Sequence, residues 1–270
     1  MSRQDALSRL FDALPPFLPG KVWIAGAGPG DPGLLTVEAA AALGTADSVV
    51  HDALVSAGVL ALAGTHATLI PAGKRGGKPS AHQGDITETL IARARSGERV
   101  LRLKGGDPYV FGRGGEEVLA LARAQIPFRV LPGVTAGLAG LSAASIPATM
   151  RGVNQALVLV TGHGAGSDAA FDWAALARLG QPIVLFMAIR TIGAIAARLI
   201  EGGLSRTTPA AAIASATTPD QKVCISTLGG IEDAIRRAGI VPPALVVIGD
   251  IVAQRAELDA ALSNLVKAAS

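Results

Sequence analysis

The sequence predicts an α/β protein with two domains. Short apolar runs rich in β-branched residues alternate with longer stretches that fit helices, which is typical of a mostly parallel sheet covered by helices. About ten such runs occur, and a single sheet of that many strands is rare. The chain has 270 residues, of which 50% are hydrophobic, so it can fill two medium-sized cores. We therefore expect two sheets, with a boundary near residues 132–140.

The predicted strands are bounded by turn residues. They cover residues 22–27, 48–51, 68–72, 99–103, 128–131, 156–161, 183–187, 211–214, 223–227 and 245–249. Helices are expected between them, for example at residues 34–43, 87–95, 115–124 and 192–200. These elements give an N-terminal α/β domain, residues 21–134, and a C-terminal α/β domain, residues 135–258. We expect residues 1–20 to form a loosely attached arm and residues 259–270 a tail or helix end.

The balance of charge argues against a nucleic-acid ligand. The formal net charge of +3 comes from 24 basic and 21 acidic residues, whereas proteins that bind phosphate backbones gain affinity from many neutralised phosphates. Basic residues nevertheless cluster in two places, and we expect these clusters to hold a polyanion. The first comprises Lys74, Arg75 and Lys78, and the second comprises Arg99, Arg102, Lys104 and Arg113.

Other features predict a cytoplasmic protein without a membrane partner. Cys224 is the only cysteine, so an intrachain disulfide and a multi-cysteine metal site are excluded, and we expect a buried, inert thiol. The longest uninterrupted apolar stretch, residues 183–189, is far shorter than the roughly 18 residues that span a bilayer. The N-terminus does not resemble a secretory signal.

The first glycine-rich loop, Gly26-Ala-Gly-Pro-Gly-Asp31, directly follows the first predicted strand. Glycines there let the backbone adopt left-handed angles and let a ligand approach main-chain atoms. Pro29 and Pro32 interrupt the geometry of a Rossmann fingerprint, which argues against a dinucleotide pyrophosphate site. A tight turn without any ligand is the alternative.

Two further loops follow predicted strands of the first domain. Residues 104–117 begin Lys-Gly-Gly-Asp-Pro, and glycines after a buried strand expose backbone groups where open α/β sheets bind ligands. Asp107 either accepts hydrogen bonds from a ribose or an ammonium group, or caps the segment that follows. The third loop, Pro132-Gly-Val-Thr-Ala-Gly137, allows close approach of a flat ligand, although Thr135 is equally suited to be a helix N-cap.

Taken together, these loops resemble the tetrapyrrole methylases. The similarity rests on residues 26–36, the segment Val50-His-Asp-Ala-Leu54, residues 73–75, Gly105-Gly-Asp-Pro108 and residues 132–136, and it extends from Val22 to about Ala256. Residues 72–78 and 111–117 are similar to the branch of the family that methylates uroporphyrinogen III.

The resemblance implies a fold of two α/β domains with S-adenosylmethionine bound in the cleft between them, S-adenosylhomocysteine as its product, no metal, and a homodimer. The implied cofactor contacts are small or backbone-donating positions. They are Pro29, Gly105, Gly106, Asp107, Val110, Thr135, Ala136, Met187, Ala216 and Ala244.

The resemblance also implies the reaction, which is the transfer of two methyl groups to C2 and C7 of uroporphyrinogen III to give precorrin-2 for siroheme or cobalamin. Asp52 and Lys74 are the implied proton acceptor and donor, and Arg113 is a third catalytic candidate. From the residues alone, Asp52 is interpreted as a helix N-cap and Lys74 as a solvated cation. Arg75 and Arg151 are expected to bind the acidic macrocycle, with Glu116 orienting Arg113 from one turn along the same helix start. A surface salt bridge of little energetic value is the alternative for the last pair.

Three other functions compete with this one. A related methylase acting on a later precorrin would keep the cofactor loops, and a nicotinamide-dependent oxidoreductase could use Asp52 after the second strand. A structural or binding module would bind neither ligand. Because few residues precede Val22, we expect no fused dehydrogenase and ferrochelatase module and a reaction that stops at precorrin-2.

Overall fold

The computed structural model describes residues 3–72, 83–163 and 171–269. The chain divides into two compact units, residues 1–135 and residues 136–270. Within the described residues it forms ten strands in two five-stranded sheets, one in each unit. The prediction of two sheets is therefore confirmed.

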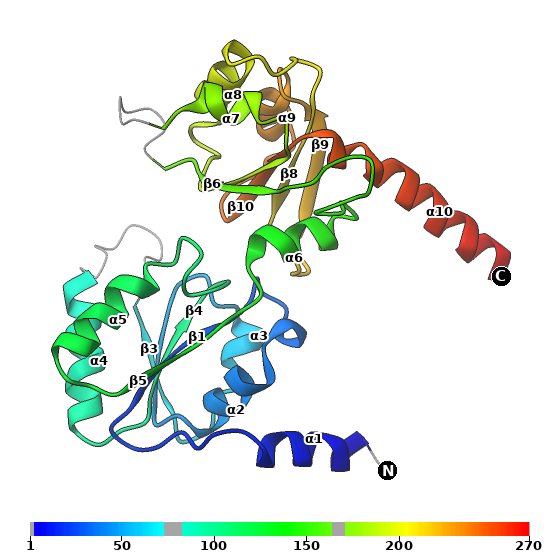
Figure 1. The fold of residues 1–270 in the computed structure, drawn as a ribbon. Helices are drawn as coiled ribbons and strands as arrows, with labels where there is room; N and C mark the ends of the chain where they lie inside the picture. The colour runs from blue at the N-terminus through cyan, green and yellow to red at the C-terminus, as the bar shows by residue number, and fades with distance from the viewer. Residues whose placement is uncertain (1–2, 73–82, 164–170, 270) are drawn as a thin grey trace. The chain divides into compact units, whose positions relative to one another are not determined.

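The first unit has a fully parallel sheet, with strand order β3-β2-β4-β1-β5. Its strands are β1 (Val22–Gly26), β2 (Ser48–His51), β3 (Thr68–Pro71), β4 (Val100–Lys104) and β5 (Phe128–Leu131). Helices α2 (Val37–Thr45) and α3 (Ala57–Leu60) cover one face, and α4 (Gln83–Arg95) and α5 (Gly114–Arg123) cover the other (Figure 1). Because all five strands run the same way, their carboxyl ends meet at one edge of the sheet.

Alternation along the interior strand β1 explains why this sheet is buried on both faces. In β1, Trp23 and Ala25 pack into the apolar cluster that contains α2, while Val22 and Ile24 pack into the cluster that contains α4. The whole strand is buried. A continuous apolar run is the expected sequence of such a strand.

The second unit has a mixed sheet, with strand order β6-β7-β10-β8-β9. Its strands are β6 (Val158–Thr161), β7 (Ile183–Phe186), β8 (Pro209–Ala214), β9 (Lys222–Thr227) and β10 (Ala244–Ile248). Only β6 and β7 pair in parallel, so the prediction of a mostly parallel sheet is wrong here. For β8 and β9 the reason is the short connection of residues 215–221, which suits an antiparallel pair, whereas parallel neighbours need a long crossover.

Helices cover both faces of the second sheet as well. Side chains of α7 (Trp173–Arg178), α8 (Ile192–Glu201) and α9 (Ile231–Arg237) fill the core of one face. The other face packs against α6 (Ala136–Ala143) and the short 3-10 helix η2 (Asp250–Val252). The chain ends in α10 (Gln254–Ala269), which Figure 1 shows extending from this unit.

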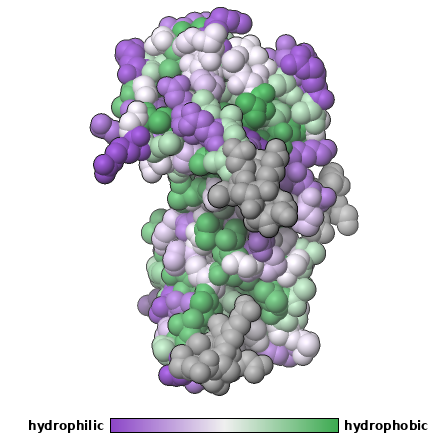
Figure 2. Space-filling view, turned by 90° about the vertical axis from the view of Figure 1, so that its right-hand side faces the viewer, coloured by the Kyte–Doolittle hydropathy of each residue, from purple (hydrophilic) through white to green (hydrophobic). Residues whose placement is uncertain are grey.

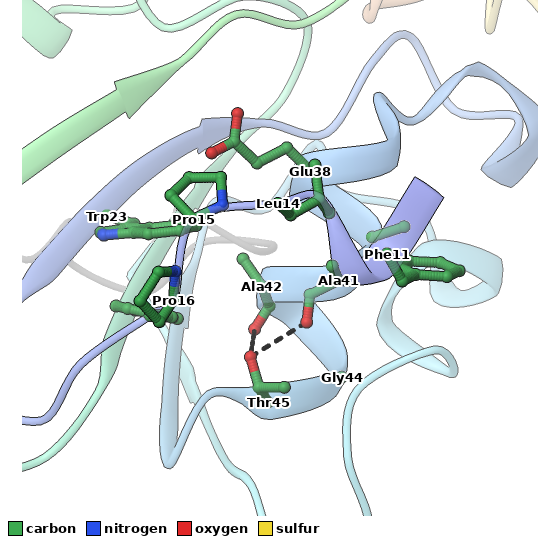
Figure 3. A pocket seen from close by; sticks show the side chains of 12 residues that line it. Phe11, Leu14, Pro15, Pro16, Trp23, Glu38, Ala41, Ala42, Gly44 and Thr45 are labelled. Atoms are coloured by element: carbon green, nitrogen blue, oxygen red, sulfur yellow. Dashed lines mark hydrogen bonds between the residues drawn. The ribbon is translucent and has the colours of Figure 1, made fainter. Parts of the chain in front are cut away.

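Within the first unit, the N-terminal segment packs near the amino ends of the strands. After α1 (Arg3–Asp12), the ring of Phe17 stacks on Trp23 with 4.4 Å between ring centroids, and Arg99 Nε donates to Phe17 O at 3.1 Å. A pocket between this segment and the end of α2 is lined by Phe11, Leu14 and Trp23 among others (Figure 3). Thr45, at its rim, donates to Ala41 O and Ala42 O. This pocket lies away from the carboxyl ends of the strands, where the glycine-rich loops are.

In the part of the chain that the structure describes, no helix is both long and apolar enough to cross a bilayer. Figure 2 shows polar and apolar residues interspersed over the face it presents. Cys224 is a free, partly buried thiol on β9, and burial raises its pKa, which suppresses formation of the reactive thiolate.

Candidate functional site

Three glycines hold the loops of the first unit together at the carboxyl edge of its sheet. Gly26 ends β1, Gly106 follows β4 and Gly133 follows β5. A Cβ atom placed on Gly26 would lie 2.5 Å from Gly106 O, and one placed on Gly133 would lie 2.6 Å from the Cα of Gly26. No side chain fits in this glycine junction, so the three loops contact each other through their backbones.

Asp107 ties two of these loops together. Its Oδ2 accepts from Gly133 N at 3.0 Å, and its Oδ1 accepts from Tyr109 N at 2.8 Å. The contact with Tyr109 N agrees with one of the two alternatives for Asp107, in which it caps the segment that follows. Val110 N donates to the backbone oxygen of Asp107 at 3.3 Å, so these two predicted cofactor residues close one turn, directly after Gly105 and Gly106.

The loop after β1 is fixed against the loop after β4. Gly106 N donates to Gly28 O at 2.7 Å, and Gly28 N donates to Gly106 O at 3.2 Å, which places Pro29 beside the glycine junction. Asp31 then caps the 3-10 helix η1 (Pro32–Leu34), and α2 begins only at Val37. No α-helix starts directly from the glycine loop, so this site lacks the geometry of a dinucleotide fingerprint.

In the second unit, small residues gather at one edge of the mixed sheet. Met187 follows β7 and Ala216 lies two residues beyond β8, while Ala244 begins the antiparallel strand β10 and pairs with Ala214. Helix α6, which begins at Ala136, packs on the same edge. Its Gly137 faces the ring of Phe186, and its Gly140 faces Leu245 and Ala216. The structure therefore brings together the four cofactor residues predicted in this unit.

A group of four charged side chains, the buried charge cluster, lies beneath the carboxyl edge of the first sheet. It comprises Asp52 after β2, Arg102 and Lys104 on β4, and Glu117 on α5. Glu117 Oε1 accepts from Arg102 Nε and from Lys104 Nζ, each at 3.1 Å. Arg102 also donates from Nη2 to Asp52 Oδ1 and from Nη1 to Val50 O, the latter at 3.2 Å.

These contacts correct the predicted role of the second basic cluster. Arg102 and Lys104 are buried against carboxylates, and Arg99 pairs with Asp47 at 3.2 Å. Two cations and two carboxylates sum to no net charge, which is how buried charges are usually tolerated. Of that cluster only Arg113 is exposed, so the other three are not placed to receive a polyanion.

Asp52 is held by its side chain rather than used as a helix cap. The N-cap of α3 is Ser56, whose side chain accepts from Val59 N, so the helix-cap alternative for Asp52 is wrong. Lys104 Nζ lies 3.9 Å from Asp52 Oδ2. Burial lowers the pKa of Lys104, and the Arg102 charge lowers it further, while Asp52 and Glu117 oppose both effects.

Arg113 and Glu116 form the pair expected from the sequence. Arg113 Nε donates to Glu116 Oε1 at 2.9 Å and Nη2 to Glu116 Oε2 at 2.6 Å, with more than half of each side chain exposed. Hydrogen bonding to Glu116 raises the pKa of Arg113, and the same contact lowers the pKa of Glu116. Arg151 is exposed in a turn of the second unit. The predicted residues Lys74 and Arg75, and Lys78 of the first basic cluster, lie outside the described residues.

Sequence reasoning missed the buried charge cluster and Glu117 in particular. The available signal was the run Val100-Leu-Arg-Leu-Lys104, in which two charged residues alternate with leucines in a strand expected to be buried. Buried cations need carboxylate partners, so Glu117 on the next helix was a candidate.

Comparisons with known proteins agree with this architecture. The sequence profile of the tetrapyrrole (corrin/porphyrin) methylases matches residues 21–232. A uroporphyrinogen-III C-methyltransferase of Sinorhizobium sp is 52% identical over 252 residues, which are 93% of this chain and 90% of that protein. A siroheme synthase of Nitrosomonas europaea is 43% identical over 92% of this chain, but the matched part is 53% of that protein.

A solved structure has the same fold. It is a uroporphyrin-III C-methyl transferase of Thermus thermophilus complexed with S-adenyl homocysteine, with a TM-score of 0.72 and 37% identity over 86% of this chain and 98% of that one. The profile match and these identities cover both sheets and the loops at their edges. On this evidence the chain belongs to the tetrapyrrole methylases.

Proposed function

We propose that the chain transfers two methyl groups from S-adenosylmethionine to C2 and C7 of uroporphyrinogen III and so makes precorrin-2, a precursor of siroheme and cobalamin. The observation that carries this proposal is the 52% identity, over 93% of the chain, with a uroporphyrinogen-III C-methyltransferase. The identity to that protein favours this substrate over a later precorrin. The loop after β1 does not open an α-helix, which argues against a dinucleotide.

The residues present fit S-adenosylmethionine. Backbone groups of the loop after β4 border the glycine junction at the carboxyl edge of a parallel sheet, where open α/β sheets bind ligands. In the second unit three of the four corresponding positions are alanines, and an adenine edge can be recognised by main-chain groups alone. We assign the cofactor contacts to Pro29, Gly105, Gly106, Asp107, Val110, Thr135, Ala136, Met187, Ala216 and Ala244.

S-adenosylmethionine supplies a methyl group that is already activated on a sulfonium sulfur. A pyrrole carbon of the substrate donates its π electrons to form the new carbon–methyl bond, and the electron pair of the broken carbon–sulfur bond stays on sulfur. The methylated macrocycle then loses a proton. The protein's main task is orientation in a dry site, which can supply on the order of 7–11 kcal/mol.

We assign proton acceptance to Asp52, with Lys74 as the proton donor. Asp52 lies at the carboxyl edge of the sheet, and 27% of its side chain is exposed, so a ligand can reach it. A well-placed acid or base contributes roughly 10²–10⁴-fold to the rate.

The substrate carries eight carboxylates, so its recognition requires guanidinium groups. We assign this role to Arg75, Arg113 and Arg151, with Glu116 orienting Arg113. Glu116 engages Arg113 through two parallel hydrogen bonds, which fixes the plane of the guanidinium group. We also propose that the protein is a cytoplasmic homodimer.

The test is methyl transfer by the purified protein, with isotopically labelled S-adenosylmethionine and freshly generated uroporphyrinogen III. We expect two labelled methyl groups per macrocycle. Absence of transfer, or transfer only to a later precorrin, would reject the proposal. Calorimetry provides an independent check, because NAD is expected not to bind and S-adenosylmethionine is.

A further inference from the structure

The buried charge cluster connects the interior of the first unit to its carboxyl edge. The exposed fractions of the side chains are 2% for Arg102, 3% for Lys104 and 0% for Glu117, against 27% for Asp52. Asp52 is therefore the member of the cluster that a ligand can touch. The other three are buried, and Arg102 and Lys104 lie next to its carboxylate.

The guanidinium group of Arg102 is fixed on three sides. Nε donates to Glu117, Nη1 donates to the backbone oxygens of Val50 and Leu103 at 3.2 and 3.4 Å, and Nη2 donates to Asp52 Oδ1. Because the group is planar, these contacts set both the position and the plane of the nitrogen that meets Asp52.

The Asp52 carboxylate is constrained from both sides. Its Oδ1 accepts from Arg102, and its Oδ2 lies 3.9 Å from Lys104 Nζ, which in turn donates to Glu117. The backbone of Asp52 is also held, because Asp52 N donates to Leu103 O at 3.1 Å. These contacts fix the direction in which the remaining lone pairs of the carboxylate face solvent.

Stability alone is a poor reason for such a cluster. Buried ion pairs lose about as much free energy by desolvation as they gain by attraction, and apolar residues of similar volume often replace them without loss. Three fully buried charged residues that converge on one accessible carboxylate indicate a role at that carboxylate.

We infer that Arg102 and Lys104 are positioning residues for Asp52, and that Glu117 balances their charge so that both can be buried beneath it. The inference rests on the proposed function, in which Asp52 accepts the proton that the methylated macrocycle loses. It adds three residues that touch neither substrate nor cofactor but set the geometry of the proton transfer.

The test is a double-mutant cycle on kcat for methyl transfer, using Arg102→Lys, Asp52→Asn and the double variant. Arg102→Lys keeps the charge but cannot maintain all three contacts, and a misplacement of about 1 Å can cost 10²-fold in rate. We expect kcat to fall about 10- to 100-fold, with the KM values for both substrates changed less than about threefold. When Asp52→Asn is already present, the same change is expected to lower kcat by less than about threefold, since interacting residues are not additive.

Arg99→Lys is the matched control. Arg99 directly precedes β4 and pairs with Asp47, so it offers the same chemistry in the same unit but at the amino end of the strand. We expect its kcat to stay within about twofold of the original chain, because it has no contact with Asp52. Thermal unfolding and S-adenosylmethionine binding are measured for every variant.

If Arg102→Lys does not fold, the same double-mutant cycle with Asp52→Asn is measured with Lys104→Met. It is unbranched like lysine, leaves Arg102 paired with Asp52 and Glu117, and removes the Lys104 contacts with Asp52 Oδ2 and Glu117 Oε1. The inference is supported if the substitution lowers turnover in variants that keep Asp52 and not in variants that carry Asp52→Asn. Equal losses with and without Asp52→Asn, unchanged kcat in the folded variant, or full activity of Asp52→Asn would overturn it. Absence of turnover in the unchanged chain would instead reject the proposed function and this inference with it.

Discussion

Gly133 has no side chain, and this absence lets the three loops of the glycine junction meet. It faces Gly26 and Gly106 so closely that a methyl group would lie 2.6 Å from the Cα of Gly26. Both neighbours are backbone atoms, so they cannot rotate away. We predict that Gly133→Ala lowers the free energy of unfolding by at least 1–3 kcal/mol, on the order of overpacked sites, and weakens S-adenosylmethionine binding.

Gly115→Ala is the control for this prediction. Gly115 lies in α5 with no atom within 4 Å of an added Cβ, so alanine is expected to maintain or raise stability by up to about 1 kcal/mol. Thermal unfolding and calorimetry with S-adenosylmethionine check both variants. Unchanged binding and stability of Gly133→Ala would show that the loops are not locked at this junction.

For Arg113 we predict that a substitution affects function but not stability. Its pair with Glu116 is exposed and spans three residues of one helix start, so Arg113→Met is expected to change the free energy of unfolding by less than about 0.5 kcal/mol. Turnover of uroporphyrinogen III is expected to be lost while affinity for S-adenosylmethionine is kept. Arg236→Met removes an exposed pair of the same spacing with Asp233, and we expect it to leave both turnover and affinity intact. Normal turnover of Arg113→Met would refute its role in substrate binding.

At individual residues, the sequence was most informative where chemistry is local. The turn-forming glycines of each loop and the Arg113–Glu116 pair depend on neighbours a few positions away, and both could be predicted, whereas the junction of Gly26, Gly106 and Gly133 could not. The partnership of Arg102 with Asp52 joins residues fifty positions apart, through the pairing of β2 with β4. Strand order was not predictable from the sequence pattern, so neither was this contact.

Among the elements, the ten strands were predictable because apolar β-branched runs are distinctive, and the observed ends differ from the predicted ones by two residues at most. The direction of the strands in the second sheet could not be predicted. A helix separates β9 from β10 just as helices separate the parallel strands of the first unit, yet β10 inserts antiparallel between β7 and β8. The hydrophobic pattern of a strand does not determine which neighbouring strand it pairs with.

Glu98 links α4 to β2 in the first unit, and the state of its carboxyl predicts how stability depends on pH. It follows α4, accepts from Arg93 of that helix at 3.0 Å, and accepts from Ser48 at the start of β2. Burial raises its pKa, but hydrogen bonds from Ser48 and Arg93 outweigh this and hold the pKa below its usual value. A carboxyl with a depressed folded-state pKa stabilises the fold above its unfolded pKa, and this contribution is lost as pH falls through the folded value.

We therefore predict that Glu98→Gln lowers the free energy of unfolding by about 1 kcal/mol at pH 7, with the difference shrinking below about pH 4. Urea unfolding at pH 7 and at a pH below about 4 measures this difference in the free energy of unfolding. Glu88→Gln is the control, because Glu88 is exposed on the same helix, and its effect is expected to be within about 0.5 kcal/mol at either pH. A deficit of Glu98→Gln that is the same at both pH values would contradict the ionic origin of the stabilisation.

For the whole molecule, the proposed homodimer predicts a particle of about twice the 27.1 kDa chain mass in light scattering coupled to size-exclusion chromatography. Dilution is expected to leave this mass unchanged at concentrations used for assay, since homodimer interfaces of enzymes are usually large. A single-chain mass across the concentration range would reject the dimer.

Backbone groups at the carboxyl edge of the parallel sheet are proposed to bind the sulfonium nucleoside, and every assigned role depends on this placement. A crystal structure of this chain with S-adenosylhomocysteine tests it most directly. We predict that the nucleoside contacts the backbone of Gly105, Gly106 and Asp107 beside the glycine junction. Density for it elsewhere, such as in the pocket beside Trp23 at the amino edge, would contradict the proposed placement.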